Sequence, residues 1–203
     1  MLIKSLRNCF SSSKLFAKSA IRLLLEKINS SIDEAQLDSL ETFTQCAKSS
    51  YNPNDYQEYI DSMWSSFHKL VVNSSKSNIS EAAVSAIQAL SQSIATNLQS
   101  SNIESGPKLH FISIEWFVKK AFDSCLSSLN DMEDLKLVWP NVKCLAAIAS
   151  SNSTANLLVI NKIIPLLISN YNNSTFVNQK KICLDILWNF LDETLKWDHK
   201  GTI

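Results

Sequence analysis

Apolar residues recur every three or four positions along most of the chain, and short polar stretches rich in Ser and Asn separate these segments. This spacing places apolar side chains on one face of a helix. The polar breaks fall near 29–32, 49–54, 73–78, 99–107, 150–154 and 169–175. Between the breaks the pattern predicts eight helices, at roughly 14–28, 32–48, 54–72, 79–99, 108–129, 132–150, 154–170 and 176–197.

The expected helix starts carry residues that suit a helix N-terminus. Proline is tolerated in the first turn, and Ser or Asn can cap the free backbone N–H groups. The candidates are Pro53 and Pro107 for the first turn, and Ser30, Ser31, Asn78 and Asn130 for the caps. The acidic cluster Asp131, Glu133 and Asp134 favours a helix N-terminus over a catalytic carboxylate group, because the helix dipole stabilises negative charge there. Pro165 should lie inside a helix, whereas Pro140 lies either inside one or in the first turn of a helix that starts later.

The helices pair into four hairpins, at approximately 14–48, 54–99, 108–150 and 154–197. Their second helices share an apolar motif, which reads Leu37, Leu40 and Phe43, then Val84, Ile87 and Leu90, then Trp139, Val142 and Leu145, and less regularly Cys183, Ile186 and Phe190. Helical-hairpin repeats of the HEAT and armadillo type have periods of about 40–47 residues. The sequence therefore predicts an all-α, HEAT-like superhelix forming a single array over 1–203, with a closed helical bundle as the alternative. The expected core includes Leu40, Phe43, Ile87, Leu90, Val142, Leu145, Ile164, Leu167 and Ile186.

Glycine and charge narrow the possible classes of protein. The chain has two glycines, Gly106 and Gly201, although sheets and phosphate-binding loops rely on glycine for tight turns. Lys plus Arg and Asp plus Glu are equal at 19 each, which gives a formal net charge of zero. Nucleic-acid binders usually carry a basic excess to neutralise phosphates. We therefore expect no direct nucleic-acid binding.

Residues that carry metal or catalytic chemistry are scattered. The five cysteines, Cys9, Cys46, Cys125, Cys144 and Cys183, form no CxxC pair, and their odd number argues against a disulfide framework. The three histidines, His68, His110 and His199, have no metal ligand at the usual spacing. We expect no catalytic, cofactor-binding or metal-binding residues. The five tryptophans, Trp64, Trp116, Trp139, Trp188 and Trp197, are expected in the core, with Trp197 the weakest candidate.

The first 25 residues are basic and contain no acidic residue, which imitates a mitochondrial presequence. The rival interpretation is an ordinary repeat helix. Membrane insertion is not expected, because the most apolar stretch, 157–168, is interrupted by Asn161, Lys162 and Pro165 and is too short to span a bilayer.

Several segments resemble the MMS nineteen nucleotide-excision-repair protein family. These segments are IRLLLEKINSSIDEAQLDSLETF, MWSSF, EAAVSAIQALSQSI, MEDLKLVWPNVKCLAAIAS and IIPLLISNY. The DLKLVWP run is the most specific piece, because no helical period requires Trp followed by Pro. The resemblance extends from about Asn8 to Trp197. It places the basic N-terminal residues inside the family pattern, which favours the repeat-helix interpretation. Arg22 departs from the pattern, since the family often has proline there.

The resemblance implies an internal segment of a longer HEAT-repeat adaptor of the cytosolic iron–sulfur assembly targeting complex. Such an adaptor would act in the cytoplasm and nucleus and help deliver iron–sulfur clusters to apo-proteins of DNA repair, replication and transcription. Its partners would be the other subunits of the complex and these client apo-proteins. The resemblance implies no catalytic residues and leaves the partner-binding residues unknown.

Two other functions remain open on the sequence alone. One is a different HEAT-repeat adaptor, such as a nuclear-transport receptor or a phosphatase scaffold, and the other is an enzyme with an unrecognised helical active site. The first and last predicted helices carry apolar residues on more than one side, from Ile21 to Ile28 and from Ile182 to Leu191. Neither looks like the polar cap that ends a repeat array. We therefore expect the isolated segment to self-associate.

Overall fold

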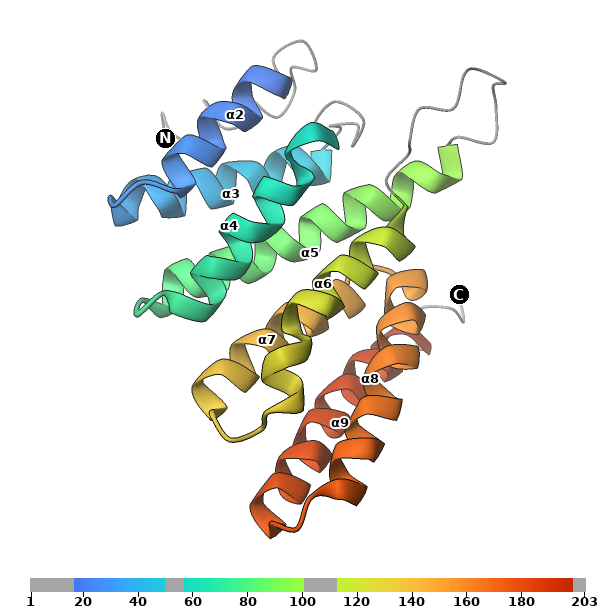
Figure 1. Ribbon diagram of the computed structural model, residues 1–203. Coiled ribbons are helices and arrows are strands. Elements are labelled where there is room, and N and C mark those ends of the chain that lie inside the picture. Colours follow the sequence, from blue (N-terminus) through green and yellow to red (C-terminus); the bar gives the residue numbers. More distant parts are fainter. Residues whose placement is uncertain (1–16, 50–56, 101–112, 199–203) are drawn as a thin grey trace. The chain divides into compact units, whose positions relative to one another are not determined.

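The computed structural model describes residues 17–49, 57–100 and 113–198, and within them every regular element is a helix (Figure 1). No described residue lies in a strand, which confirms the predicted all-α class. None of the described helices is both long and apolar enough to cross a membrane. The chain divides into two compact units, residues 1–113 and 114–203.

The first unit contains α2 (Ala17–Ile28), α3 (Asp33–Ser49), the short 3-10 helix η3 (Gln57–Tyr59), α4 (Ile60–Asn73) and α5 (Ser77–Ser100). Helix α2 pairs with α3, and α4 pairs with α5. The two hairpins also stack on each other, because α2 contacts α4 and α3 contacts α5. Corresponding helices of successive hairpins therefore lie against each other, as a HEAT-like stack requires.

The second unit contains α6 (Ile114–Asn130), α7 (Leu135–Ala149), α8 (Ser153–Asn173) and α9 (Val177–Asp198). Its hairpins are α6 with α7 and α8 with α9, and α6 contacts α8 while α7 contacts α9. The same packing rule therefore operates in both units. The predicted helix bounds agree with the structure to within a few residues wherever the structure describes them. The prediction of one array over the whole chain stays a prediction.

Side chains at the helix starts explain several of these bounds. The Asp134 carboxylate accepts a hydrogen bond from the Lys136 N–H at 2.9 Å, and the Asn152 side-chain oxygen accepts one from the Ala155 N–H at 2.8 Å. Each satisfies a backbone donor that the helix itself leaves unpaired. The acidic cluster is thus confirmed as a helix start. Asn130 is not a cap, because it is the last residue of α6.

The two helix prolines both lie inside their helices. Pro165 is within α8, as predicted. Helix α7 starts at Leu135, three residues later than predicted, but Pro140 lies beyond its first turn, so the first-turn alternative is wrong. Next to Pro140, the buried Asn141 side chain donates a hydrogen bond to the Leu137 carbonyl at 2.8 Å.

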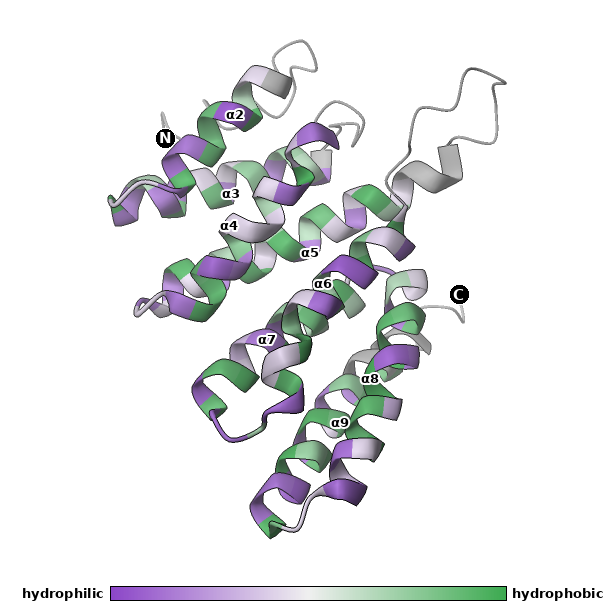
Figure 2. Ribbon diagram, in the orientation of Figure 1, coloured by the Kyte–Doolittle hydropathy of each residue, from purple (hydrophilic) through white to green (hydrophobic). Residues whose placement is uncertain are grey.

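The repeated apolar motif describes the core well. All the predicted core residues are buried except Ile164, which is half-buried while its neighbour Ile163 is fully buried. The three regular copies of the motif also share one burial pattern. Their first members, Leu37, Val84 and Trp139, are half-buried, and their second and third members are buried. Hydrophobic and hydrophilic residues alternate along the helices accordingly (Figure 2). This common pattern supports the repeat interpretation.

The expectation that the tryptophans are core residues is only partly correct. Trp64 is buried and Trp139 is half-buried, but Trp116 is 41% exposed and Trp188 is 72% exposed. Helical spacing alone therefore overestimates their burial, because a helix also has positions beside its core-facing stripe. The Trp197 side chain lies outside the description, as do Cys9, Pro53, Gly106, Pro107, His110, His199 and Gly201.

Truncating a central leucine should destabilise each unit. Leu90 in α5 and Leu145 in α7 are fully buried, and Leu→Ala changes at such sites cost about 2–5 kcal/mol of unfolding free energy. We expect losses in this range for Leu90→Ala and Leu145→Ala in urea denaturation. Ile32→Ala, at a position 62% exposed, serves as the control and should have little effect. Neutral results at both leucines would contradict the packing described here.

Candidate functional site

A groove between the second helices of the first unit is the clearest candidate surface for binding another protein. It is open to solvent and has a volume of about 460 Å³. Its walls are Leu37, Glu41, Thr44 and Lys48 from α3, and Asn78, Glu81, Ala82 and Ser85 from α5. The α3 residues are spaced by four, three and four positions, so they share one helix face. The groove is therefore a consequence of stacking two second helices side by side.

The small side chains of α5 keep the groove open. Two hydroxyl groups that line the groove donate hydrogen bonds to backbone carbonyls of their own helices. The Ser85 hydroxyl donates to the Glu81 carbonyl at 3.0 Å, and the Thr44 hydroxyl donates to the Leu40 carbonyl at 2.8 Å. These backbone bonds leave the carboxylates of Glu41 and Glu81 and the ammonium of Lys48 as the charged groups of the groove. The groove is therefore acidic overall, and it suits a polar or basic segment of a partner.

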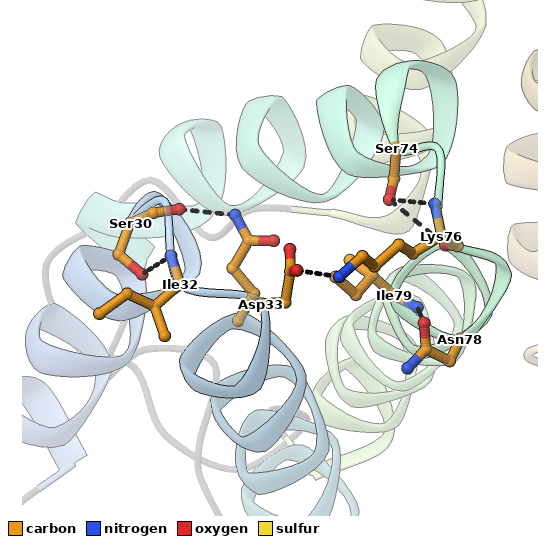
Figure 3. Close-up of polar contacts among 8 residues, drawn as sticks. Ser30, Ile32, Asp33, Ser74, Lys76, Asn78 and Ile79 are labelled. Carbon is orange, nitrogen blue, oxygen red and sulfur yellow. Dashed lines mark hydrogen bonds and ion pairs between the residues drawn. The ribbon is translucent and has the colours of Figure 1, made fainter.

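An ion pair lies beyond the N-terminal end of this groove. Asp33 begins α3, one helical turn before Leu37, and its carboxylate pairs with the ammonium of Lys76, just before α5 (Figure 3). The Ser74 hydroxyl accepts the Lys76 N–H at 3.2 Å, and the Asn78 side chain accepts the Ile79 N–H at 3.0 Å. Both charged side chains are about half exposed, so the pair is expected to contribute at most about 1 kcal/mol to stability. It links the start of α3 to the residue just before α5.

A polar contact also links the residue just after α2 to α4, the first helix of the next hairpin. The Asn29 amide donates to the Ser66 hydroxyl at 3.0 Å, and the Ser66 hydroxyl is within 3.1 Å of the Asn29 side-chain oxygen. The second unit has a comparable link, in which the Asn170 amide donates to the Leu129 carbonyl at 2.8 Å. Each link joins residues from successive hairpins, so each helps fix the stacking register inside its unit.

The thiols that the structure describes are buried and poorly suited to chemistry. Cys46, Cys125, Cys144 and Cys183 are all buried, and none of the four forms a disulfide. Burial raises the pKa of the Cys125 thiol to about 12 and raises the pKa of Cys144 well above its usual value, with the charge of Cys125 adding to the second effect. Burial also raises the pKa of Cys183, whose sulfur lies 3.4 Å from the Met132 sulfur. Thiolates are the reactive and metal-binding form, and these environments disfavour it.

The side chains that could carry metal or catalytic chemistry are dispersed in the part of the chain that the structure describes. Among the described residues, no group of three or more His, Cys, Asp and Glu side chains could hold a metal ion. The His68 ring stacks on Trp64 with ring centroids 5.1 Å apart. That aromatic contact gives His68 a structural role on α4.

The groove is not among the features predicted above, although the sequence contains a signal for it. The residues of α3 that line it lie beside the buried positions Leu40 and Phe43, at the same helical spacing. The repeat motif places α3 and α5 in equivalent positions, and that equivalence could have been extended to these outer positions. What the sequence lacks is the distance between the two helices, which depends on the packing of the whole unit.

Comparisons with known proteins agree with the family resemblance. Residues 1–73 match a family described as "Dos2-interacting transcription regulator of RNA-Pol-II". The chain is 30% identical to the MMS19 nucleotide excision repair protein homolog of Danio rerio over 194 residues, and 27% identical to that of Homo sapiens over 199 residues. These alignments cover 95% and 98% of this chain. They bear out the resemblance to the MMS nineteen family that the sequence indicates.

The chain spans only 18% of the length of each of these two relatives. Among solved structures it is similar to computationally designed armadillo repeat proteins for modular peptide recognition, with 16% identity, 82% of this chain and 63% of that chain covered, and a TM-score of 0.38. It is also similar to a designed armadillo repeat protein in complex with the peptide (KR)4, with 15% identity, 93% and 91% covered, and a TM-score of 0.36.

The buried thiols should make the protein less stable at alkaline pH. A thiol that ionises near pH 9.0 when exposed keeps its proton in the folded chain until about pH 12 at Cys125. Between these values the unfolded state releases the proton first, so the unfolding free energy falls as pH rises, by at most about 1.4 kcal/mol per pH unit for one thiol. Below pH 9 the thiol has no such effect. The measurement is urea denaturation from pH 8 to 10.5, in which Cys125→Ala should show a shallower decline than the parent chain; equal slopes would contradict it.

The dispersed thiols also lead to a prediction about iron–sulfur clusters. A [4Fe–4S] cluster normally uses four cysteine ligands. Anaerobic reconstitution of this chain with iron and sulfide should therefore leave no stoichiometric cluster after desalting. Visible absorption and iron analysis measure the result. A defined cluster with about four irons per chain would overturn the prediction.

Proposed function

We propose that this chain, a relative of the MMS19 nucleotide excision repair proteins, is a non-catalytic segment of a protein-binding scaffold. The observation that carries the proposal is an alignment with such proteins over nearly the whole chain. The fold is consistent with the role, because stacked helical hairpins offer extended side-chain surfaces to partners. The acidic groove between α3 and α5 is the part of that surface to which we assign partner binding.

The finer role rests on the family resemblance. We propose that the chain acts as part of an adaptor in the cytosolic iron–sulfur assembly targeting complex and helps deliver clusters to apo-proteins of DNA repair, replication and transcription. It would work in the cytoplasm and nucleus, and its partners would be the other subunits of that complex and the client apo-proteins. The buried thiols support a recruiting role over a cluster-holding role, because a cluster needs accessible thiolates.

Affinity capture with the tagged full chain tests this function. We expect purified subunits of the targeting complex, supplied one at a time, to be retained by the chain. The double variant Glu41→Lys/Glu81→Lys should weaken retention of a groove-bound subunit by about tenfold or more, since reversing charge in a contact surface costs binding energy. Glu26→Lys on the exposed surface of α2 is the matched control and should behave like the parent chain.

Other outcomes would contradict the proposal. Retention of a small GTPase or of a phosphatase catalytic subunit, with no targeting-complex subunit retained, would favour the other class of HEAT-repeat adaptor. Retention of the correct subunit with no difference between the groove variant and the Glu26→Lys control would remove the groove from the proposal. Circular dichroism of each variant confirms that the helices are intact.

A further inference from the structure

A small polar pocket lies between the two hairpins of the second unit, at the end where both hairpins turn. It has a volume of about 190 Å³. One wall comes from the α6–α7 turn and the other from the α8–α9 turn. The described residues that line it are Asn130, Met132, Asn170, Asn173, Ser174 and Gln179. Both walls belong to one unit, so this lining does not depend on what lies next to α9.

Carboxamide groups dominate the lining, and we call this site the amide pocket. Asn130, Asn170, Asn173 and Gln179 each contribute one carboxamide, and none of the described lining residues is charged. A carboxamide offers N–H donors together with an oxygen acceptor. The amide pocket can therefore both donate hydrogen bonds to a ligand and accept them from it.

The charged side chains of the two turns do not line the pocket. The Asp131 carboxylate accepts the Glu133 N–H at 3.3 Å, and the Asp134 carboxylate caps α7. The Lys180 ammonium lies 5.1 Å from the centre of the Tyr171 ring. The Glu133 side chain is exposed. The pocket therefore selects a ligand by hydrogen bonding and not by net charge.

Part of the hydrogen-bonding capacity of the pocket is already used. The Asn170 amide donates to the Leu129 carbonyl at 2.8 Å, and the Gln179 side-chain oxygen accepts the Ser174 hydroxyl at 2.7 Å. Within the described part of the chain, no hydrogen bond engages the Asn170 side-chain oxygen or the Gln179 NH2 group. One acceptor and one donor group therefore remain for a ligand.

The first unit contains an equivalent turn. The sequence around the α4–α5 turn reads NSSKSNI, and the sequence around the α8–α9 turn reads NSTFVNQ. In each turn a serine hydroxyl donates to the carbonyl two residues later, from Ser74 to Lys76 at 3.3 Å (Figure 3) and from Ser174 to Phe176 at 3.2 Å. The two turns therefore share one local structure, and their residues can be compared position by position.

This comparison shows that the repeat does not require the amides. Asn170 corresponds to Leu70, and Gln179 corresponds to Ile79, which is buried. In the first unit the junction between hairpins is thus closed by apolar packing and by the ion pair described above. Apolar burial stabilises a fold, so amides in these places are not explained by stability. Their presence around a pocket points to a ligand.

The size and chemistry of the pocket indicate the class of ligand. A cavity of about 150 Å³ accommodates a benzene molecule, so this pocket has room for one planar amide group and the atoms attached to it. An amide uses both its N–H and its C=O, which matches the donors and acceptors of the lining. A nucleotide fits less well, because the described lining residues provide neither an aromatic ring for stacking nor a basic group for phosphate.

We propose that the amide pocket binds an uncharged amide group of a partner protein. The amide belongs either to the main chain of an extended segment or to an Asn or Gln side chain, since both present the same chemistry. The inference rests on the proposed scaffold function and adds a second binding site to the acidic groove of the first unit.

Three pentapeptides serve as probes, each acetylated and amidated at its ends. Their central residue is Gln, Glu or norleucine, and the other residues are Ala. NMR titration of the full chain follows the side-chain NH2 signals, and we expect saturable shifts at Asn170 and Gln179 at millimolar peptide concentrations. A preference of about fivefold or more for the Gln peptide assigns the bound amide to a side chain. Equal binding of the three peptides assigns it to the main chain.

The variant Gln179→Ile gives the pocket the residue found in the first unit. It should weaken peptide binding by about fivefold or more, because hydrogen bonds to the ligand are lost. The turn at Ser174 should survive, since Ser74 makes the same bond close to Ile79. Gln92→Ile, at an exposed position of α5, is the matched control and should leave binding unchanged. Circular dichroism should show the same helix content in both variants.

Three results would overturn the inference. These are the absence of saturable shifts with every peptide, tighter binding of the Glu peptide than of the other two, and equal binding by Gln179→Ile and the parent chain. Failure of the peptide test with retained capture of targeting-complex subunits would remove the amide pocket alone. Peptide binding without capture of any such subunit would instead remove the proposed function.

Discussion

The structure depends on one constraint, which is that each helical hairpin has an apolar face that it cannot cover by itself. In the first unit α3 covers α5, and in the second α7 covers α9, so that Leu40 and Leu90 in one and Leu145 and Ile186 in the other become fully buried. Removing this apolar surface from water supplies most of the stabilising free energy. The polar links, such as Asn29 with Ser66 and Asn170 with Leu129, then fix the register of the stack.

The surfaces that could bind partners follow from the same constraint. Stacking two second helices leaves a groove between their outer faces, and in the first unit this groove carries the carboxylates of Glu41 and Glu81. Where α9 has no described helix against its outer face, the apolar face stays exposed, including Trp188.

Much of the fold could be predicted from the sequence because it is local. The helical period, the acidic helix start around Asp134 and the shared motif around Leu40 and Ile87 each depend on residues a few positions apart. The exposure of Trp116 and Trp188 could not be predicted in this way, since a side chain is buried only if another element covers it. The error of one position at Ile164 has a similar cause, because α8 is apolar on adjacent positions and the sequence does not show which one faces α6 and α7. The groove is a tertiary feature, and only its polar lining is visible in the sequence.

The central claim is that this chain acts by offering exposed helix faces to other proteins. Hydroxyl-radical footprinting tests it most directly, because the labelling rate of a side chain reports its exposure. The measurement compares the free chain with the chain saturated by a purified subunit of the targeting complex. Protection should appear at Leu37 in the groove, while Leu23 and Ile32 keep their rates. Unchanged rates at all of these side chains under saturating conditions would contradict the claim.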